Sequence, residues 1–393
     1  MALSRRHFVQ TVGIGAGAAL TSSVWGRGRE NSVWSAFEPE LQAVERGVIC
    51  IASNENPVGP GQKVLGSLRT LLEGGTRPGR YSGQMGELSE AIAGHFKVKT
   101  ENVLLGEGST EILRAATQVF TSKTKALVGT IPTYEECAGY AELIGNPVRG
   151  VKLNSEFKID LDAMLAAAKG AGLVFYCNPN NPTATYVGAK ATRDFLTKLI
   201  AASPETTILI DEAYFDYVTD PDHETHVPFA LEHPQVIVAR TFSKAYGMAG
   251  LRQGYALGHP DTLKKLRGWT ASSGTGSLNV FGMAAATVAI GQDASFTTNE
   301  RKRNAAVRDF SMKWFADRGM KPTDCQANFM FVNIGTPAKA FREACRAKGV
   351  MVARDFPPFH QTHARISLGT MEEMQKAVQV FGEVLGKKST AAA

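Results

Sequence analysis

The chain has 393 residues, of which 44% are hydrophobic and 20% charged, which indicates a globular protein of two domains and excludes a disordered or fibrous one. The formal net charge is +6, but the lysines and arginines form no basic run interleaved with aromatic residues, so we expect no nucleic-acid partner. The five cysteines show neither CxxC spacing nor a companion histidine cluster, so we expect no metal site and no disulfide framework.

Residues 1–30 are expected to be an export signal. The stretch SRRHFVQTVGIGAGAAL joins Arg5 and Arg6 to a Gly/Ala-rich apolar segment and resembles a twin-arginine signal, in which the pattern Ser-Arg-Arg-x-Phe ends here at Phe8. We therefore expect a periplasmic protein, although no clear small-x-small cleavage site stands out. The alternatives are an ordinary basic amphipathic start or an uncleaved anchor, and a cytoplasmic location follows if the signal interpretation is wrong. Elsewhere no apolar run reaches the ~18 residues of a membrane span.

Residues 71–290 show strand and helix patterns in alternation. Six short segments are apolar throughout, as in a parallel sheet covered on both faces: 102–108, 125–130, 172–177, 207–214, 236–241 and 253–258. Four segments between them have apolar residues at helical spacing: 109–120, 134–145, 160–170 and 191–203. This alternation predicts a large α/β domain with a mostly parallel sheet.

The rest of the chain predicts a smaller α+β domain over residues 291–393. A long charged amphipathic helix is expected at 299–319 and a second helix at 338–349, with strands at 328–334 and 364–369. Residues 31–70 are expected to join this smaller domain.

The first candidate site is the stretch LLGEGSTEILRAA. A predicted strand runs into Gly108, Ser109 and Thr110, where a helix begins at once. Free backbone N–H groups and the positive end of the helix dipole therefore point to one place, which favours an anion such as phosphate. An ordinary helix cap has the same residues and remains the alternative.

Polar residues follow two further strands, and ligands bind at strand ends in open α/β sheets. In FYCNPNNPTATY, prolines after Asn178 and Asn181 fix a rigid loop that holds Asn181 as an amide donor, although a plain Asn-Pro turn is also common. In ILIDEAY, Asp211 ends a buried strand and needs a cationic partner, and Tyr214 presents its hydroxyl three residues later.

The stretch RTFSKAYGMAGLR places Lys244 after another strand, with Ser243 and Arg252 nearby. A partly desolvated lysine beside another cation has a lowered pKa and forms imines with aldehydes. A phosphate seat, an amide donor, a buried carboxylate, a phenol and such an amine are together the parts that hold pyridoxal phosphate.

The order and spacing of NENP, GEGSTE, PTYEE, CNPNNPT, DEAY, TFSKAYGMAGLRQGY and ARISLGT resemble the fold-type I pyridoxal-phosphate aminotransferases, specifically the histidinol-phosphate aminotransferase group. The resemblance runs from about residue 48 to 384. It implies the aspartate-aminotransferase-like fold, pyridoxal 5'-phosphate as cofactor, and a homodimer with shared active sites. It also implies transfer of an α-amino group between an amino acid or histidinol phosphate and a 2-oxo acid.

The resemblance assigns roles around the cofactor ring. It implies that Lys244 forms the imine with the cofactor and then moves the substrate's α-proton, and that Asp211 pairs with the pyridine nitrogen. Asn181 and Tyr214 would hydrogen-bond the phenolic oxygen, and Tyr134 would stack on the ring.

The remaining roles concern the cofactor phosphate and the substrate. The resemblance implies phosphate contacts from these residues: Gly108, Ser109, Thr110, Ser243, Arg252, Tyr81 of the second subunit and, as a weaker candidate, Thr241. Arg365 would grip the substrate α-carboxylate bidentately. Asn56 and Asn328 would line the same place, and Arg354 corresponds to an arginine that contacts the substrate phosphate in the histidinol-phosphate enzymes. Nearby Phe356, Phe359 and His360 either favour an aromatic or imidazole side chain or are packing residues.

One departure and two alternatives remain open. The usual Asn-Pro-Thr-Gly ends here in Ala184, which loses easy access to positive φ and leaves the loop conformation open. The same residues are compatible with a decarboxylase, racemase or lyase, because the bond that breaks depends on substrate orientation. A non-catalytic binding protein on this fold is the third interpretation.

Overall fold

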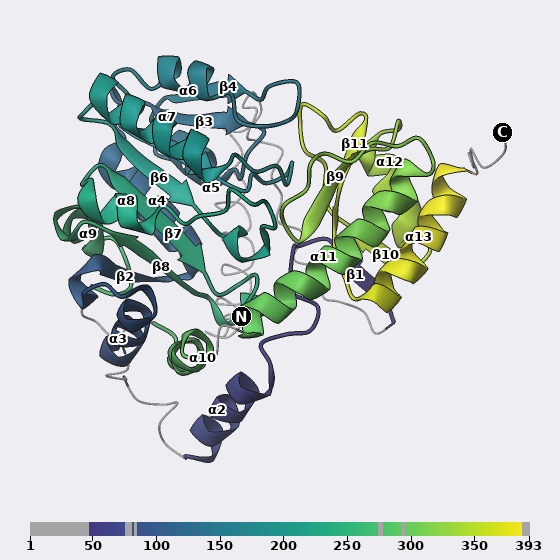
Figure 1. Cartoon of the computed structure of the whole chain (residues 1–393), viewed down its shortest axis with the longest axis horizontal. Helices are drawn as coiled ribbons and strands as arrows, with labels where there is room; N and C mark the ends of the chain where they lie inside the picture. The colour runs from purple at the N-terminus through teal and green to yellow at the C-terminus, as the bar shows by residue number, and fades with distance from the viewer. Residues whose placement is uncertain (1–46, 75–80, 82–84, 274–277, 293–294, 387–393) are drawn as a thin grey trace, which may run out of the picture. The chain divides into compact units, whose positions relative to one another are not determined.

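A computed structural model of the chain describes residues 47–74, 81, 85–273, 278–292 and 295–386. The expected export signal at 1–30 lies outside the described residues, as do residues 31–46. The centre of the described chain is a seven-stranded sheet with helices packed around it (Figure 1). Its strand order is β2-β8-β7-β6-β5-β3-β4. The strands are β2 (Val103–Glu107), β3 (Leu127–Ile131), β4 (Val148–Lys152), β5 (Leu173–Cys177), β6 (Thr207–Asp211), β7 (Val236–Thr241) and β8 (Gln253–Gly258).

The six apolar segments expected to be strands all lie in this sheet, which confirms the predicted fold class. Strand β8 runs antiparallel to both of its neighbours, β2 and β7, and the other printed pairings are parallel. The seventh strand, β4, was not predicted. It pairs with β3 at an edge, and only Val151 of its five residues is buried, so it lacks the apolar run of a central strand.

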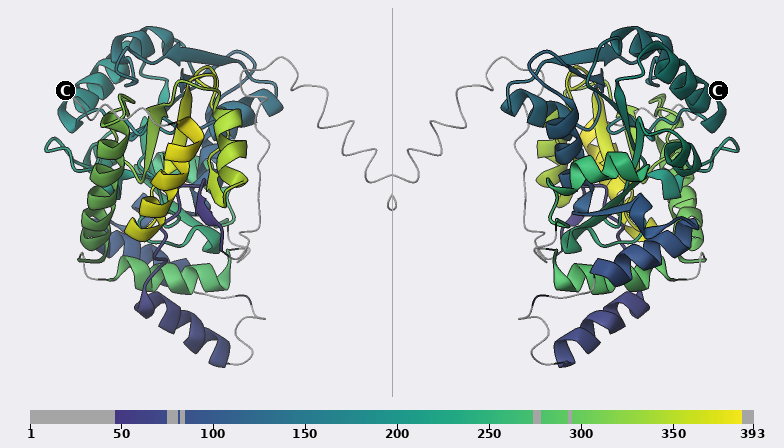
Figure 2. Two further views of the ribbon diagram at one scale, coloured as in Figure 1. Left: turned by 90° about the vertical axis from the view of Figure 1, so that its right-hand side faces the viewer. Right: turned by 90° about the vertical axis from the view of Figure 1, so that its left-hand side faces the viewer.

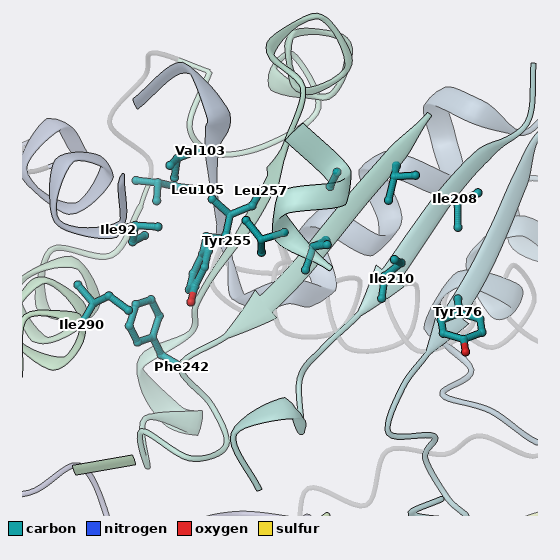
Figure 3. Close-up of a cluster of buried hydrophobic side chains, with 14 of the residues drawn as sticks. Ile92, Val103, Leu105, Tyr176, Ile208, Ile210, Phe242, Tyr255, Leu257 and Ile290 are labelled. Atoms are coloured by element: carbon teal, nitrogen blue, oxygen red, sulfur yellow. The ribbon is translucent and has the colours of Figure 1, made fainter. Parts of the chain in front are cut away.

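Helices follow the strands in the alternation that the sequence predicts. They are α3 (Met85–Phe96), α4 (Gly108–Phe120), α5 (Glu136–Leu143), α6 (Leu161–Ala167), α7 (Ala189–Ala202), α8 (Val227–Glu232), α9 (Pro260–Arg267) and α10 (Val280–Ile290). Side chains from the sheet and from α3 and α10 form one hydrophobic core, in which Leu105, Leu257 and Tyr255 lie beside Ile92 and Ile290 (Figure 3). Burial of these apolar surfaces is the main term that stabilises the sheet.

A second hydrophobic cluster belongs to the C-terminal part of the chain and to Ile51 of its first strand. Two short sheets contribute to it: β1 (Ile49–Ile51) pairs parallel with β10 (Val350–Val352), and β9 (Phe329–Asn333) pairs antiparallel with β11 (His363–Ser367). The helices that contribute are α11 (Ser295–Ala316), α12 (Ala338–Arg346) and α13 (Met371–Leu385). Strand β1 therefore joins sequence near residue 50 to sequence near residue 350.

Helix α2 (Gln62–Glu73) lies beside α10, and both views in Figure 2 show the two helices together below the sheet. On its other side α2 exposes Leu72, whose exposed fraction is 61%, and Leu65. None of the helices in the described residues combines the length and the apolar composition that a membrane span requires.

Strand direction determines which residues meet at the edge of the sheet. Parallel strands β3, β5, β6 and β7 end at the same edge, and antiparallel β8 begins there. Gly254 of β8 lies between Gly106 of β2 and Thr241 of β7. A Cβ atom at Gly254 would lie 2.2 Å from the Ser109 backbone nitrogen, so glycine is required for α4 to begin directly over β8.

Candidate active site

An anion seat forms where α4 begins. Gly108 has a φ of 69°, and a Cβ atom there would lie 2.3 Å from Arg252 Nη2, so the guanidinium occupies the space that glycine leaves. Arg252 itself is held in the left-handed conformation, and its Nη1 donates to Ala249 O at 3.1 Å and to Ser243 Oγ at 3.4 Å. The N-terminus of a 13-residue helix and a guanidinium therefore face one place, as an anion requires.

Thr241, the weaker candidate for a phosphate contact, has one hydrogen-bond partner in strand β8 and one in its own turn. Its Oγ1 donates to Gln253 O at 3.3 Å and accepts from the Ser243 N–H at 3.1 Å. The hydroxyl of Thr241 therefore fixes the backbone of Ser243 at the end of β7.

Asp211 is a buried carboxylate with few partners. Its Oδ1 accepts from the Ala213 N–H at 3.1 Å, and Cys177 Sγ lies 4.0 Å from Oδ2. Within the described chain no lysine, arginine or histidine is at ion-pair distance from it. Burial raises the pKa of Asp211 from 3.8 to about 7, against the opposing effects of the Ala213 N–H and of Lys244. The fold thus supplies a carboxylate that is only partly ionised near neutral pH, and an additional cation would favour its ionised form.

Lys244 lies just past β7, where its Nζ donates to Ser53 O at 3.1 Å and lies 5.6 Å from the centre of the Tyr214 ring. Burial, followed by the positive charge of Arg365, lowers the pKa of Lys244 from 10.5 to about 8. The amine therefore has a substantial neutral fraction near neutral pH and is suited to attack a carbonyl carbon.

Tyr214 takes part in a hydrogen-bond chain that sequence reasoning missed. Asn54 Nδ2 donates to Tyr214 Oη at 3.1 Å, and Asn54 Oδ1 accepts from Ser367 Oγ at 2.6 Å. Burial raises the pKa of Tyr214, so its phenol stays protonated and can donate. Asn54 lies in the NENP motif and Ser367 in the ARISLGT motif, but their contact spans 313 residues of sequence. The two motifs were the available signal, and only the fold shows that they meet.

Arg365 connects the loop that contains Asn181 to the segment that contains Ala52. Its Nη1 donates to Asn181 Oδ1 at 2.8 Å and its Nη2 to Ala52 O at 2.6 Å. Its Nε is buried and has no hydrogen-bond partner among the described residues. Burial, with a contribution from Arg354, lowers the pKa of Arg365 to about 10, so the side chain remains cationic at neutral pH.

Asn56 and Asn328 hold the segment around residue 54 in place. Asn56 Nδ2 donates to Ala245 O at 2.9 Å, directly after Lys244, and Asn328 Nδ2 donates to Asn54 O at 2.9 Å. Asn328 Oδ1 is buried without a partner within the described residues. Both asparagines therefore lie beside the candidate residues, and their amide nitrogens bind backbone.

Two predicted residues differ from the rest. Arg354 Nη2 pairs with Glu135 Oε1 at 2.5 Å, a carboxylate that the sequence analysis did not single out. Tyr81 has an exposed fraction of 90%, whereas the other candidate residues are buried or half-buried. Tyr134, in contrast, hydrogen-bonds Thr110 and is close enough to Asp211 to be influenced by its charge.

The structure defines the conformation of the loop after β5 and the surroundings of Phe359. Ala184 adopts a φ of 59°, so the loop keeps the positive φ that glycine favours, at a conformational cost of about 1 kcal/mol. Its N–H donates to Asn180 O and its carbonyl accepts from the Gln326 N–H. Phe359 packs against Phe157 and Phe331, which places it in a packing cluster.

These residues fit pyridoxal phosphate. The anion seat at Arg252 suits its phosphate, Asp211 lacks the cation that a pyridinium supplies, and Lys244 is an amine of lowered pKa. Among the described residues no cluster of histidine, cysteine, aspartate or glutamate could hold a metal ion, and all five cysteines are free. Fold and site thus define a pyridoxal-phosphate enzyme.

Comparison with known proteins gives the family. Residues 46–381 match the family Aminotransferase class I and II, and the chain belongs to it. It is 33% identical over 348 residues to a histidinol-phosphate aminotransferase of Moorella thermoacetica, covering 86% of each chain. It is also 33% identical over 357 residues to histidinol-phosphate aminotransferase 2 of Methylococcus capsulatus, covering 88% of this chain and 93% of the relative.

Solved structures of aminotransferases resemble this chain. A histidinol-phosphate aminotransferase from Sinorhizobium meliloti in complex with pyridoxal 5'-phosphate has a TM-score of 0.79 at 26% identity, covering 86% of this chain and 90% of that one. An aspartate aminotransferase mutant from Thermus thermophilus shares the fold, with a TM-score of 0.74 at 20% identity and coverage of 88% and 99%. The protein is therefore a pyridoxal-phosphate-dependent transaminase with the aspartate-aminotransferase-like fold.

The raised pKa of Asp211 predicts a pH-dependent stability of the cofactor-free protein. A folded-state pKa raised from 3.8 to about 7 means that the folded protein binds the proton more tightly, so stability is lost as pH rises through this window. We expect Asp211→Asn to raise the free energy of unfolding of the apoprotein by several kcal/mol more at pH 8 than at pH 4. Each pKa unit corresponds to ~1.4 kcal/mol.

Denaturant unfolding of apoprotein at both pH values measures this difference. Asp162→Asn, at an exposed position of α6, controls for the loss of one negative charge. Equal effects of Asp211→Asn at pH 4 and pH 8 would contradict the burial argument.

Proposed function

We propose that this transaminase moves the α-amino group of an amino acid, or the amino group of histidinol phosphate, to a 2-oxo acid, with Lys244 as the catalytic base. The observation that carries the proposal is the convergence of Lys244, Asp211, Tyr214 and Arg365 at one edge of the sheet. Histidinol phosphate, which the names of the relatives include, and aromatic amino acids are the two donor classes to compare.

The cofactor, when bound, supplies an electron sink for the electron pair released at the substrate's α-carbon. Lys244 Nζ would hold the cofactor at its aldehyde carbon and would be the base that takes the substrate's α-proton. Its lowered pKa makes the neutral, proton-accepting amine available near neutral pH. The charge of Asp211 keeps the ring nitrogen protonated, because burial leaves that carboxylate in need of a cation.

Other side chains position the reactants. The protonated Tyr214 hydroxyl and the Asn181 amide would hydrogen-bond the ring's phenolic oxygen, and Tyr134 would stack on the ring. Gly108, Ser109, Thr110, Ser243 and Arg252 hold the phosphate at the start of α4. Arg365 has a buried and unpartnered Nε to offer an acid group of the substrate, with Asn56 and Asn328 keeping the adjoining segment in place.

A donor panel tests the function. Purified protein loaded with cofactor is expected to convert histidine, phenylalanine, tyrosine or histidinol phosphate to the oxo product. The cofactor should change to its amine form in this reaction, and a 2-oxo acid should reverse that change. Lys244→Ala is expected to lower kcat by about 10³-fold or more, because the proton-transfer group is lost. After borohydride reduction, mass spectrometry should find the cofactor attached to wild-type protein and not to this variant.

The outcomes of this panel separate the alternatives. The alternatives to transamination all lack reversible exchange of the amino group. Loss of carbon dioxide would then indicate a decarboxylase, a change of configuration at the α-carbon a racemase, and elimination a lyase. No turnover and no bound cofactor would support the non-catalytic binding protein.

We further propose a homodimer in which Tyr81 of each chain reaches the cofactor phosphate of the other. The support is the 90% exposure of Tyr81 and the exposed Leu72, Trp269 and Val58. We expect Tyr81→Phe to weaken cofactor binding by about tenfold through one lost hydrogen bond. Dialysis equilibrium measures the affinity for the cofactor, and analytical ultracentrifugation gives the mass. A monomer at micromolar concentration with unchanged activity would overturn this proposal.

Export by the twin-arginine route to the periplasm is the last element of the proposal, supported by Ser4, Arg5, Arg6 and Phe8. This route carries folded proteins, so a cofactor bound in the cytoplasm travels with the enzyme. Changing Arg5 and Arg6 together to lysine is expected to keep the protein in the cytoplasm, measured by fractionation and immunoblotting in the native host. Equal amounts of wild type and the double lysine variant in the periplasm would contradict export by the twin-arginine route.

A further inference from the structure

Two arginines meet at the end of the site that would take the acid group of the substrate. The ring centre of Phe356 lies 4.6 Å from Arg365 Cζ and 4.3 Å from Arg354 Cζ, so one aromatic ring contacts both guanidiniums. The charge of Arg354 also acts on Arg365 and contributes to its lowered pKa. Two cations so placed would favour a doubly charged anion if nothing else were present.

Glu135 changes this charge balance. Its carboxylate pairs with Arg354 Nη2 at 2.5 Å, and the side chains of Glu135 and Arg354 have exposed fractions of only 17% and 19%. The charge of Glu135 also acts on Arg365, in the direction opposite to that of Arg354. Arg354, Arg365 and Glu135 together carry a formal charge of +1, which matches a carboxylate of charge −1.

Glu135 is fixed at this position by its own backbone. It precedes the first residue of α5, directly after Tyr134, and its carbonyl accepts from the Gly139 N–H at 2.8 Å. Arg354 comes from the segment after β10, 219 residues further along the chain. The ion pair therefore joins the segment of the predicted ring-stacking tyrosine to the segment that ends in Arg365.

We propose that Glu135 is a specificity-determining residue, which makes the enzyme select donors with an α-carboxylate over donors with a phosphate ester at the same place. This inference rests on the proposed transaminase function and names its substrate class as α-amino acids. A phosphate monoester carries a charge of about −1.5 to −2 at neutral pH and would lie next to the Glu135 carboxylate. It would be repelled there or would have to displace Glu135 from Arg354, whereas a carboxylate needs only Arg365.

Histidine and histidinol phosphate are a matched pair of probes, since both carry the imidazole and the amine and they differ in the acid group. We expect the wild-type holoenzyme to have the larger kcat/KM with histidine. In Glu135→Gln the formal charge of the three positions becomes +2, and the ratio of kcat/KM for histidine to that for histidinol phosphate should fall by about tenfold. The change should appear mainly in KM for the ester.

Two further variants separate charge from structure. Glu135→Asp keeps the charge and should keep the preference for histidine. Glu136→Gln removes a charge from the adjacent residue, which pairs with Arg114, and should leave the ratio as in wild type. The proposal is overturned if Glu135→Gln leaves the ratio unchanged, if Glu135→Asp shifts it as far as glutamine does, or if Glu136→Gln shifts it equally.

Binding of unreactive ligands gives a readout that does not depend on turnover. Phenylpropionate and phenethyl phosphate lack the amine and differ in the acid group, and calorimetry with holoenzyme gives their dissociation constants. Wild type should bind the carboxylate more tightly, and Glu135→Gln should reverse or remove the difference. If no donor reacts and this difference is still found, the transaminase proposal fails and the charge selection stands. If donors react but wild type and Glu135→Gln both bind the two ligands equally, the proposed role of Glu135 is wrong and the transaminase function is retained.

Discussion

The buried carboxylate of Asp211 is the constraint on which the site depends. It ends a central strand, receives one backbone hydrogen bond, and has no cationic side chain at ion-pair distance among the described residues. An ionised carboxylate in that place costs several kcal/mol unless a cation joins it. The Asp211 carboxylate thus lacks a counter-charge among the described residues, and the pyridinium of the cofactor would supply one. Stability of the apoprotein and affinity for the cofactor have the same physical origin.

The antiparallel direction of β8 brings the anion seat at Gly108 and Arg252 to the same edge as Asp211. Arg252 immediately precedes β8, so its guanidinium lies where β7 ends and α4 begins. A parallel strand at this position would begin at the opposite edge and would take Arg252 with it. Glycine at positions 108 and 254 lets the guanidinium and the helix N-terminus approach each other. The distance between Lys244 and the phosphate seat is therefore set by two neighbouring strands of opposite direction.

The sequence predicts the elements of the sheet better than their arrangement. Apolar runs identified six of its seven strands, and β4 was missed because an edge strand with three exposed positions lacks such a run. Strand direction was not predictable for β8, since an apolar run has no orientation. At the site, Lys244, Asp211 and Arg365 follow from motifs. Asn54 and Glu135 do not, because their partners Ser367 and Arg354 lie 313 and 219 residues away.

Two adjacent carboxylates at the end of β6 show how completely the surroundings decide their properties. Glu212 is as deeply buried as Asp211, yet its pKa is lowered, because hydrogen bonds from His226 and the charge of Arg240 outweigh the effect of burial. Arg240 also pairs with Asp216, at 2.9 Å, so both carboxylates have a cationic partner within the protein. The pKa of Asp211 moves in the opposite direction because no such partner is provided. Of two neighbouring acids, one is neutralised by the fold and the other is left for the ligand, and this asymmetry distinguishes a structural carboxylate from a functional one.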